Sequence, residues 1–262
     1  MALARPVTRD VLPIRSEGRD ILLVLDVSSS MANDDVGERS RVRRVEAARD
    51  RALDFALARE TDRVGLLTFA RFPDLRCPPT LDEESLTAFL RPVDIVTPNS
   101  AEDGTAIGAA LARAVEVLAA DPLATRSDGE DRSRVVVLLS DGEETENVIP
   151  PEDAARLAHD AGIKVYTIGF GLGARGPFGG LRELSFDTLK EIAKTTSGEF
   201  FRARTSSDLA AVYARIDELE TVELEDPRYR TVDWFDRPLL LAGGLLLLGL
   251  VLEFLWIRRS PA

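Results

Sequence analysis

Five side chains that carry hard oxygen atoms stand at positions where they could share one metal ion. They are Asp26, Ser28, Ser30, Thr105 and Asp141. The first three are spaced as Asp-x-Ser-x-Ser, the threonine follows an Asp-Gly pair, and Asp141 precedes a glycine. Carboxylate and hydroxyl oxygens without histidine or cysteine favour Mg²⁺, Mn²⁺ or Ca²⁺ over zinc or copper. The few charges and several small hydroxyls suit Mg²⁺ best, because this ion keeps waters in its shell.

The elements that must position these side chains follow from the hydrophobic periodicity. Short apolar runs predict buried strands, at 21–27, 63–69, 134–139, 164–170 and 199–202. Apolar residues at helical spacing predict helices, at 41–59, 85–90, 106–118, 151–161, 186–195 and 209–220. Residues 73–80 contain three prolines and allow at most an edge strand. Strands that alternate with helices predict an α/β fold with a doubly wound, mostly parallel sheet and helices on both faces.

In a sheet of this kind, ligands bind beyond the carboxyl ends of the strands. The Asp26–Ser30 run ends the first predicted strand, and Asp141 follows the third. Thr105 stands at the N-terminus of the helix predicted at 106–118. We therefore expect all five oxygen donors to converge on one rim. The two carboxylates would repel each other there unless a proton or a cation joins them, which supports a metal site.

Composition limits the other functions of the chain. Its 262 residues are 45% hydrophobic and 30% charged, which fits one ordinary folded domain with additional segments. The 45 acidic and 33 basic residues give a net charge of −12, which argues against nonspecific nucleic-acid binding. Cys77 is the only cysteine, so an intramolecular disulfide and a cysteine-based zinc site are excluded.

Four acidic residues near the rim are interpreted as solvated loop charges: Asp34, Asp35, Glu143 and Glu144.

The C-terminal region predicts a membrane anchor. Residues 238–257 (PLLLAGGLLLLGLVLEFLWI) are almost entirely apolar and long enough for one transmembrane helix. A polar stalk at 221–237 precedes this span, and residues 258–262 after it begin with two arginines. Positive charges favour the cytoplasmic side, which predicts a cytoplasmic tail and an extracytoplasmic main domain. Residues 1–18 contain no signal peptide or complete span that would export the domain.

The three oxygen-bearing segments, in this order, resemble a von Willebrand factor type A (VWA) domain. The similarity covers roughly residues 20–219, and we assign the domain to 19–220. It implies that the five residues form a metal-ion-dependent adhesion site (MIDAS). Ser28, Ser30 and Thr105 would then touch the metal directly, and Asp26 and Asp141 mostly through water. An Asp or Glu from a partner protein would fill the open position.

Further stretches resemble the bacterial aerotolerance (Bat-type) membrane proteins. They are DRVGLLTFA, DGTAIGAAL, VVVLLSDGEE and GIKVYTIGFG. This resemblance implies location in the bacterial inner membrane, with MoxR-type ATPases, other Bat-type proteins or tetratricopeptide proteins as partners. Such proteins carry two membrane spans before the domain and one after it. The first residues of the chain would then be the tail of the second of those spans.

Two other functions use the same residues. A haloacid dehalogenase-like phosphatase also places an aspartate and Mg²⁺ after its first strand, and Asp26 would be its nucleophile. That chemistry needs an acid two residues later to protonate the leaving group, and Ser28 cannot supply it. A structural membrane scaffold that binds no metal is the other alternative. We therefore predict a binding module without catalytic residues.

Overall fold

A computed structural model of the chain describes the residues 7–11, 18–37, 41–121, 132–142, 144–146, 148–175, 181–182, 184–224, 229–233, 244 and 247–249. It divides into two compact units. The larger unit, Ser16–Val222, contains the predicted sheet and its helices. The smaller unit joins Met1–Arg15 with Glu223–Ala262. Its described part is a two-stranded antiparallel ladder of β1 (Val7–Val11) and β10 (Tyr229–Asp233).

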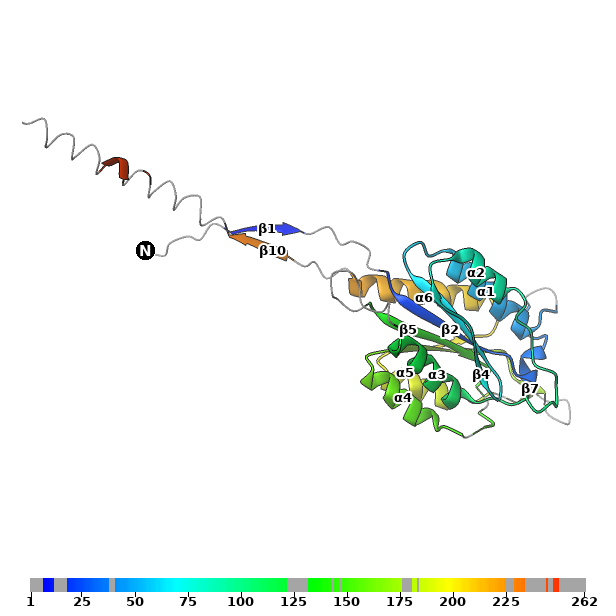
Figure 1. Ribbon diagram of the computed structural model, residues 1–262. Coiled ribbons are helices and arrows are strands. Elements are labelled where there is room, and N and C mark those ends of the chain that lie inside the picture. Colours follow the sequence, from blue (N-terminus) through cyan, green and yellow to red (C-terminus); the bar gives the residue numbers. More distant parts are fainter. Residues whose placement is uncertain are drawn as a thin grey trace, which may run out of the picture. The chain divides into compact units, whose positions relative to one another are not determined.

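A six-stranded sheet forms the centre of the larger unit (Figure 1). Its strands lie in the order β4 (Pro73–Thr80), β3 (Arg63–Phe69), β2 (Asp20–Asp26), β5 (Arg134–Ser140), β6 (Lys164–Phe170) and β9 (Phe200–Ala203). All neighbouring pairs are parallel except β3 and β4. The proline-containing strand β4 is therefore an antiparallel edge strand, as its sequence allows.

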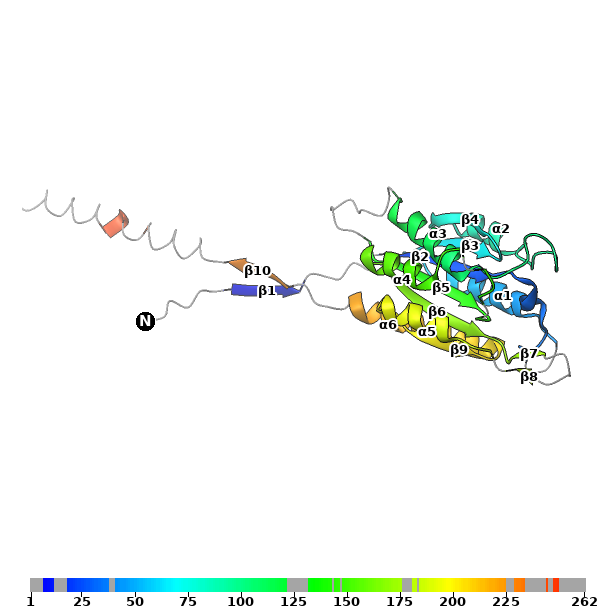
Figure 2. The same cartoon turned by 90° about the horizontal axis from the view of Figure 1, so that it is seen from below.

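Helices cover both faces of this sheet (Figures 1 and 2). One face packs against α1 (Arg44–Leu57), α2 (Glu83–Leu90) and α6 (Ser206–Leu224). The other packs against α3 (Ile107–Ala119), α4 (Pro151–Asp160) and α5 (Asp187–Thr195). Three short elements complete the unit: the 3₁₀ helix η1 (Ser29–Ala32) and the strands β7 (Ala174–Arg175) and β8 (Leu181–Arg182).

Each face of the sheet has its own hydrophobic core. Along β2, Leu23 and Leu25 point to the core with α1, whereas Leu22 and Val24 point to the core with α3. All four side chains are almost completely buried. A strand buried on both faces needs a continuous apolar run rather than alternation. This is why the short apolar runs predict the central strands.

The predicted α/β class, the parallel central strands and the helices on both faces are confirmed. The pairing of β1 with β10 was not predicted, and α6 continues to Leu224, past the end predicted at 220. The predicted membrane span at 238–257 lies outside the described residues, apart from Gly244 and residues 247–249. Among the helices in the described part, none is long and apolar enough to cross a membrane. The C-terminal span therefore stays a prediction.

Gly108 in the first turn of α3 allows a close contact with the residues that lead into α4. A Cβ atom at this position would lie 1.9 Å from the carbonyl oxygen of Ile149. We expect Gly108→Ala to lower the free energy of unfolding by about 1–3 kcal/mol, because the backbone must move apart. In an open helix the same change is stabilising by up to about 1 kcal/mol. Urea unfolding of the wild type and Gly108→Ala measures this change, with Glu116→Ala at an exposed position of α3 as control. A higher urea midpoint for Gly108→Ala than for the wild type would contradict the close contact with Ile149.

Candidate metal centre

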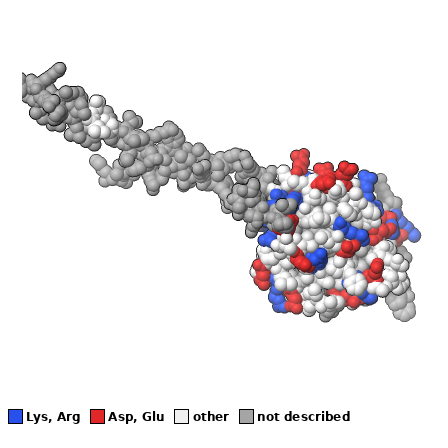
Figure 3. All heavy atoms as spheres, in the orientation of Figure 1, with Lys and Arg blue, Asp and Glu red and all other residues white. Residues whose placement is uncertain are grey.

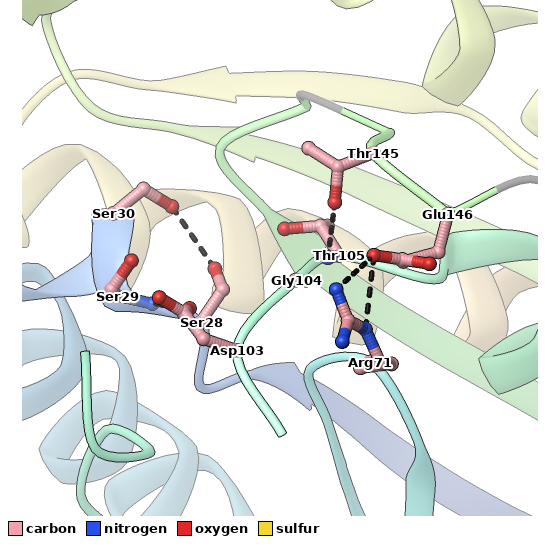
Figure 4. Close-up of a pocket in the computed structure, with 9 residues that line it drawn as sticks. All are labelled: Ser28, Ser29, Ser30, Arg71, Asp103, Gly104, Thr105, Thr145 and Glu146. Atoms are coloured by element: carbon pink, nitrogen blue, oxygen red, sulfur yellow. Dashed lines mark hydrogen bonds and ion pairs between the residues drawn. The ribbon is translucent and has the colours of Figure 1, made fainter. Parts of the chain in front are cut away.

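The loops after β2 and β5 and the segment before α3 enclose an open pocket of about 370 Å³ (Figure 4). Three hydroxyl-bearing residues of the predicted site, Ser28, Ser30 and Thr105, line it. Asp26 and Asp141 do not line this pocket and are almost completely buried. Ser28 and Thr105 are also buried, at 3% and 4% exposure, so the partly exposed Ser30 is the most accessible residue of the predicted site.

Asp26 organises the loop that follows β2. Its Oδ1 accepts hydrogen bonds from the backbone N–H and the hydroxyl of Ser28, at 2.9 and 2.5 Å. Its Oδ2 accepts a bond of 2.6 Å from the hydroxyl of Ser140 at the end of β5. The Ser28 Oγ lies 3.0 Å from the Ser30 Oγ, which brings two hydroxyls together (Figure 4). One buried carboxylate therefore fixes the first loop and joins it to the neighbouring strand.

The segment before α3 is held against both other loops. Asp103 accepts a bond of 3.1 Å from the backbone N–H of Ser29 and one of 2.8 Å from that of Asn99. Thr105 donates its N–H to Thr145 Oγ1 at 2.7 Å, and its carbonyl accepts the N–H of Thr145 at 2.9 Å. These reciprocal bonds fix Thr105 against the loop after β5. The sequence analysis did not identify Thr145, because its role depends on a contact forty residues away.

Burial and mutual repulsion act on the two carboxylates of the site. Burial, and then the nearby charge of Asp141, raise the pKa of Asp26 from 3.8 to about 7. The hydrogen bonds from Ser140 and Ser28 act in the opposite direction but do not offset this effect. A buried carboxylate pair of this kind is stabilised when a cation lies near it. The donor chemistry therefore fits a small divalent ion.

The hydroxyls are needed to complete such a site. Within the described segments, no group of three or more His, Cys, Asp or Glu side chains is placed to hold a metal ion. A set of two carboxylates and three hydroxyls contains hard oxygen donors only, which suits Mg²⁺. Asp26 ends β2, and the other four predicted residues lie after β2, before α3 and after β5, at one edge of the sheet as expected from the sequence.

Two of the acidic residues that were interpreted as solvated loop charges have structural partners, so that interpretation was wrong for them. Asp35 pairs with the guanidinium of Arg44, at 2.8 and 2.5 Å. Glu144 is half-buried, and its Oε2 accepts the N–H of Ile107 at 2.8 Å, at the start of α3. Burial raises the pKa of Glu144 to about 7, although the hydrogen bond from Ile107 acts to lower it. Glu144 supplies the cap that α3 lacks at Ala106, whose side chain cannot accept a hydrogen bond.

The fold agrees with a comparison to known families. The family model of the von Willebrand factor type A domain matches residues 20–215. The chain belongs to the VWA family. A UPF0353 protein of Mycolicibacterium paratuberculosis is 32% identical over 274 aligned residues, which cover 100% of this chain and 77% of that protein.

Two solved structures resemble this VWA domain. An aerotolerance-related membrane protein from Bacteroides fragilis is 27% identical with a TM-score of 0.62, over 77% of this chain and 98% of that chain. Proximal thread matrix protein 1 from mussel byssus, solved with a zinc-occupied MIDAS motif, is 20% identical with a TM-score of 0.58. That match covers 82% of this chain and 48% of the mussel chain, and it shows the fold alone. The first structure confirms the predicted relation to the aerotolerance-related, Bat-type proteins.

Proposed function

We propose that this VWA domain binds one Mg²⁺ ion at its MIDAS and uses the ion to hold an Asp or Glu side chain of a partner protein. Ser28, Ser30 and Thr105 would coordinate the ion directly, and Asp26 and Asp141 mostly through water. The observation that carries the proposal is the buried carboxylate of Asp26, which orients the Ser28 hydroxyl at the wall of an open pocket. Mn²⁺ or Ca²⁺ would suit the same donors.

Family membership supports a binding role without turnover. The metal would act as a Lewis acid that attracts a carboxylate, and the pocket is open to a side chain from outside. Both oxygens of Asp26 are occupied by hydrogen bonds, which disfavours its use as a phosphatase nucleophile. The zinc-occupied MIDAS of the mussel protein supports a divalent ion at this position of the fold.

We further propose that the apolar segment 238–257 anchors the domain in the bacterial inner membrane, with the domain outside and the C-terminus in the cytoplasm. The description of the Bacteroides protein as a membrane protein supports the anchor. MoxR-type ATPases, other Bat-type proteins and tetratricopeptide proteins are the proposed partners. Nucleic acid is not expected to bind, since the net charge is −12, and the face in Figure 3 intersperses acidic with basic side chains.

A titration with Mg²⁺ tests the metal assignment. The unit Ser16–Val222 contains the sheet and both cores, so it can be studied as a domain. We expect Mg²⁺ to raise its melting temperature, because a ligand at about 100 times its Kd stabilises by about 2.7 kcal/mol. Asp26→Ala should remove this response by releasing Ser28, and Ser30→Ala should weaken it.

The matched control for Asp26→Ala is Asp74→Ala, which removes an exposed carboxylate from the same sheet. It should leave the Mg²⁺ response of the domain unchanged. Equal magnesium affinity in wild type and Asp26→Ala, measured by calorimetry, would exclude the proposed metal site.

A further inference from the structure

A buried arginine lies behind the candidate metal centre. Arg44 is the first residue of α1, and its side chain is 0% exposed. Its Nη1 donates to Asp141 Oδ2 at 3.1 Å, and its Nε and Nη2 donate to the two oxygens of Asp35 at 2.8 and 2.5 Å. Nη2 also donates to the carbonyl of Gly173 at 2.7 Å. Every nitrogen of this guanidinium therefore has a hydrogen-bond acceptor.

The surrounding backbone is shaped to accommodate this guanidinium. Gly171 follows β6 with a φ of +116°, and a Cβ atom there would lie 2.5 Å from the Arg44 Cζ. Leu172, in the loop after β6, donates its N–H to Asp35 Oδ2 at 3.1 Å. This bond connects that loop to the carboxylate that pairs with Arg44. Arg44 thus joins four segments: the loop after β2, the start of α1, the end of β5 and the loop after β6. A planar, five-donor group is required for this geometry, and lysine cannot replace it.

The charges at this position make the arrangement relevant to metal binding. Asp141 is a proposed metal ligand, and its Oδ2 pairs with the Arg44 guanidinium at 3.1 Å. Asp35, which is 22% exposed on its side chain, shares the same guanidinium from the other side. Burial opposes ionisation of Asp35, yet the hydrogen bonds and charge of Arg44 hold its pKa below its usual value. The guanidinium is therefore shared between one carboxylate of the site and one outside it.

We propose that the Arg44 guanidinium is a permanent positive charge of the metal centre with two effects. It holds Asp141 in place when no metal is bound, and its charge limits the affinity of the site for Mg²⁺. This inference rests on the proposed function of the site. Arg44 is a positioning residue here, since it acts on the metal through Asp141. A fixed positive charge near a divalent ion weakens binding, and the effect is large in a buried site. Asp35 offsets part of that charge, so it favours the metal indirectly.

The proposal predicts opposite effects for two substitutions in the full chain. Arg44→Gln removes the positive charge and should tighten Mg²⁺ binding on the order of tenfold. Asp35→Asn leaves the positive charge less compensated and should weaken Mg²⁺ binding by a similar factor. In chelator, Arg44→Gln should also lower the melting temperature by about 10 °C, because Asp141 and Asp35 each lose the buried ion pair with Arg44. Calorimetry at pH 7.5 with magnesium chloride measures the affinities, and thermal unfolding measures the stability.

A purely structural role for Arg44 gives a different pattern. If its bonds only shaped the loops, both substitutions would disorder them and both would weaken Mg²⁺ binding, which would overturn the proposal. If Arg44→Gln does not fold, unchanged or tighter binding in Asp35→Asn overturns it instead. Arg215→Gln, which breaks an exposed pair with Glu218, is the control and should change neither quantity. A wild-type chain that binds no Mg²⁺ would instead exclude the proposed function itself.

Discussion

The affinity of the domain for Mg²⁺ is expected to rise about 25-fold between pH 5.5 and pH 7.5 and then to level off. The reason is the pKa of Asp26, which burial and the charge of Asp141 raise to about 7. A protonated Asp26 carries no charge for the ion and no longer accepts all the hydrogen bonds that orient Ser28 and Ser140. Calorimetric titrations with magnesium chloride in non-coordinating buffers across this range measure the profile.

The stability of the metal-free domain should change in the opposite direction. Because the pKa of Asp26 is higher in the folded state, the folded protein binds this proton more tightly than the unfolded chain does. The resulting stabilisation is complete below pH 3.8, the ordinary value, and is lost as the pH rises through 7. Asp26→Asn should remove the part of this dependence that Asp26 contributes and leave the part from Glu144, whose pKa burial also raises to about 7. A wild-type Mg²⁺ affinity that does not vary with pH would refute the role assigned to Asp26.

Replacing Asp20 with alanine is expected to lower the free energy of unfolding by about 3 kcal/mol, or roughly 10 °C in melting temperature. Asp20 begins β2 and is 1% exposed. It accepts bonds of 2.8 and 2.7 Å from Arg63 and one of 2.8 Å from Arg132. Its removal leaves the buried guanidinium of Arg63 with Asp121 as its remaining ion-pair partner.

Thermal and urea unfolding of the unit Ser16–Val222 measure this effect. Glu218→Ala breaks an exposed ion pair with Arg215 and should cost less than about 1 kcal/mol. Asp20→Asn keeps the shape of the side chain and should lie between the wild type and Asp20→Ala. If Asp20→Ala costs no more than Glu218→Ala, the buried pair contributes nothing measurable. Mg²⁺ affinity should not change, since Asp20 stands at the opposite end of β2 from Asp26.

The sequence predicts the central sheet well because each central strand can be recognised from its own run of apolar residues. Strands buried on both faces require unbroken apolar runs, and β5, which contains the run 134–139, is buried along almost its whole length. The convergence of Ser28, Ser30 and Thr105 also follows from topology, because the carboxyl ends of parallel strands share one edge. The pattern of residue types therefore predicts both the fold and the region of the site.

The environment of the site could not be predicted, because it depends on contacts between distant residues. Arg44 belongs to a charged stretch at the start of a helix, and nothing in its local pattern indicates that it is fully buried against Asp141, ninety-seven residues away. Arg71 and Glu146 line the pocket as an ion pair for the same reason, joined at 2.7 Å across seventy-five residues. The pairing of β1 with β10 joins segments whose composition is that of a linker.

The edge strands of the sheet limit how this protein can assemble with others. Pro73, Pro78 and Pro79 remove backbone donors from β4 at one edge, and β9 at the other edge is only four residues long. An incoming strand would therefore find few hydrogen-bond partners along either side, which disfavours extension of the sheet by a second copy of the domain. We therefore expect association to use side chains at the loops and helices rather than the sheet edges. The two edge strands thereby disfavour edge-to-edge stacking of domains into filaments.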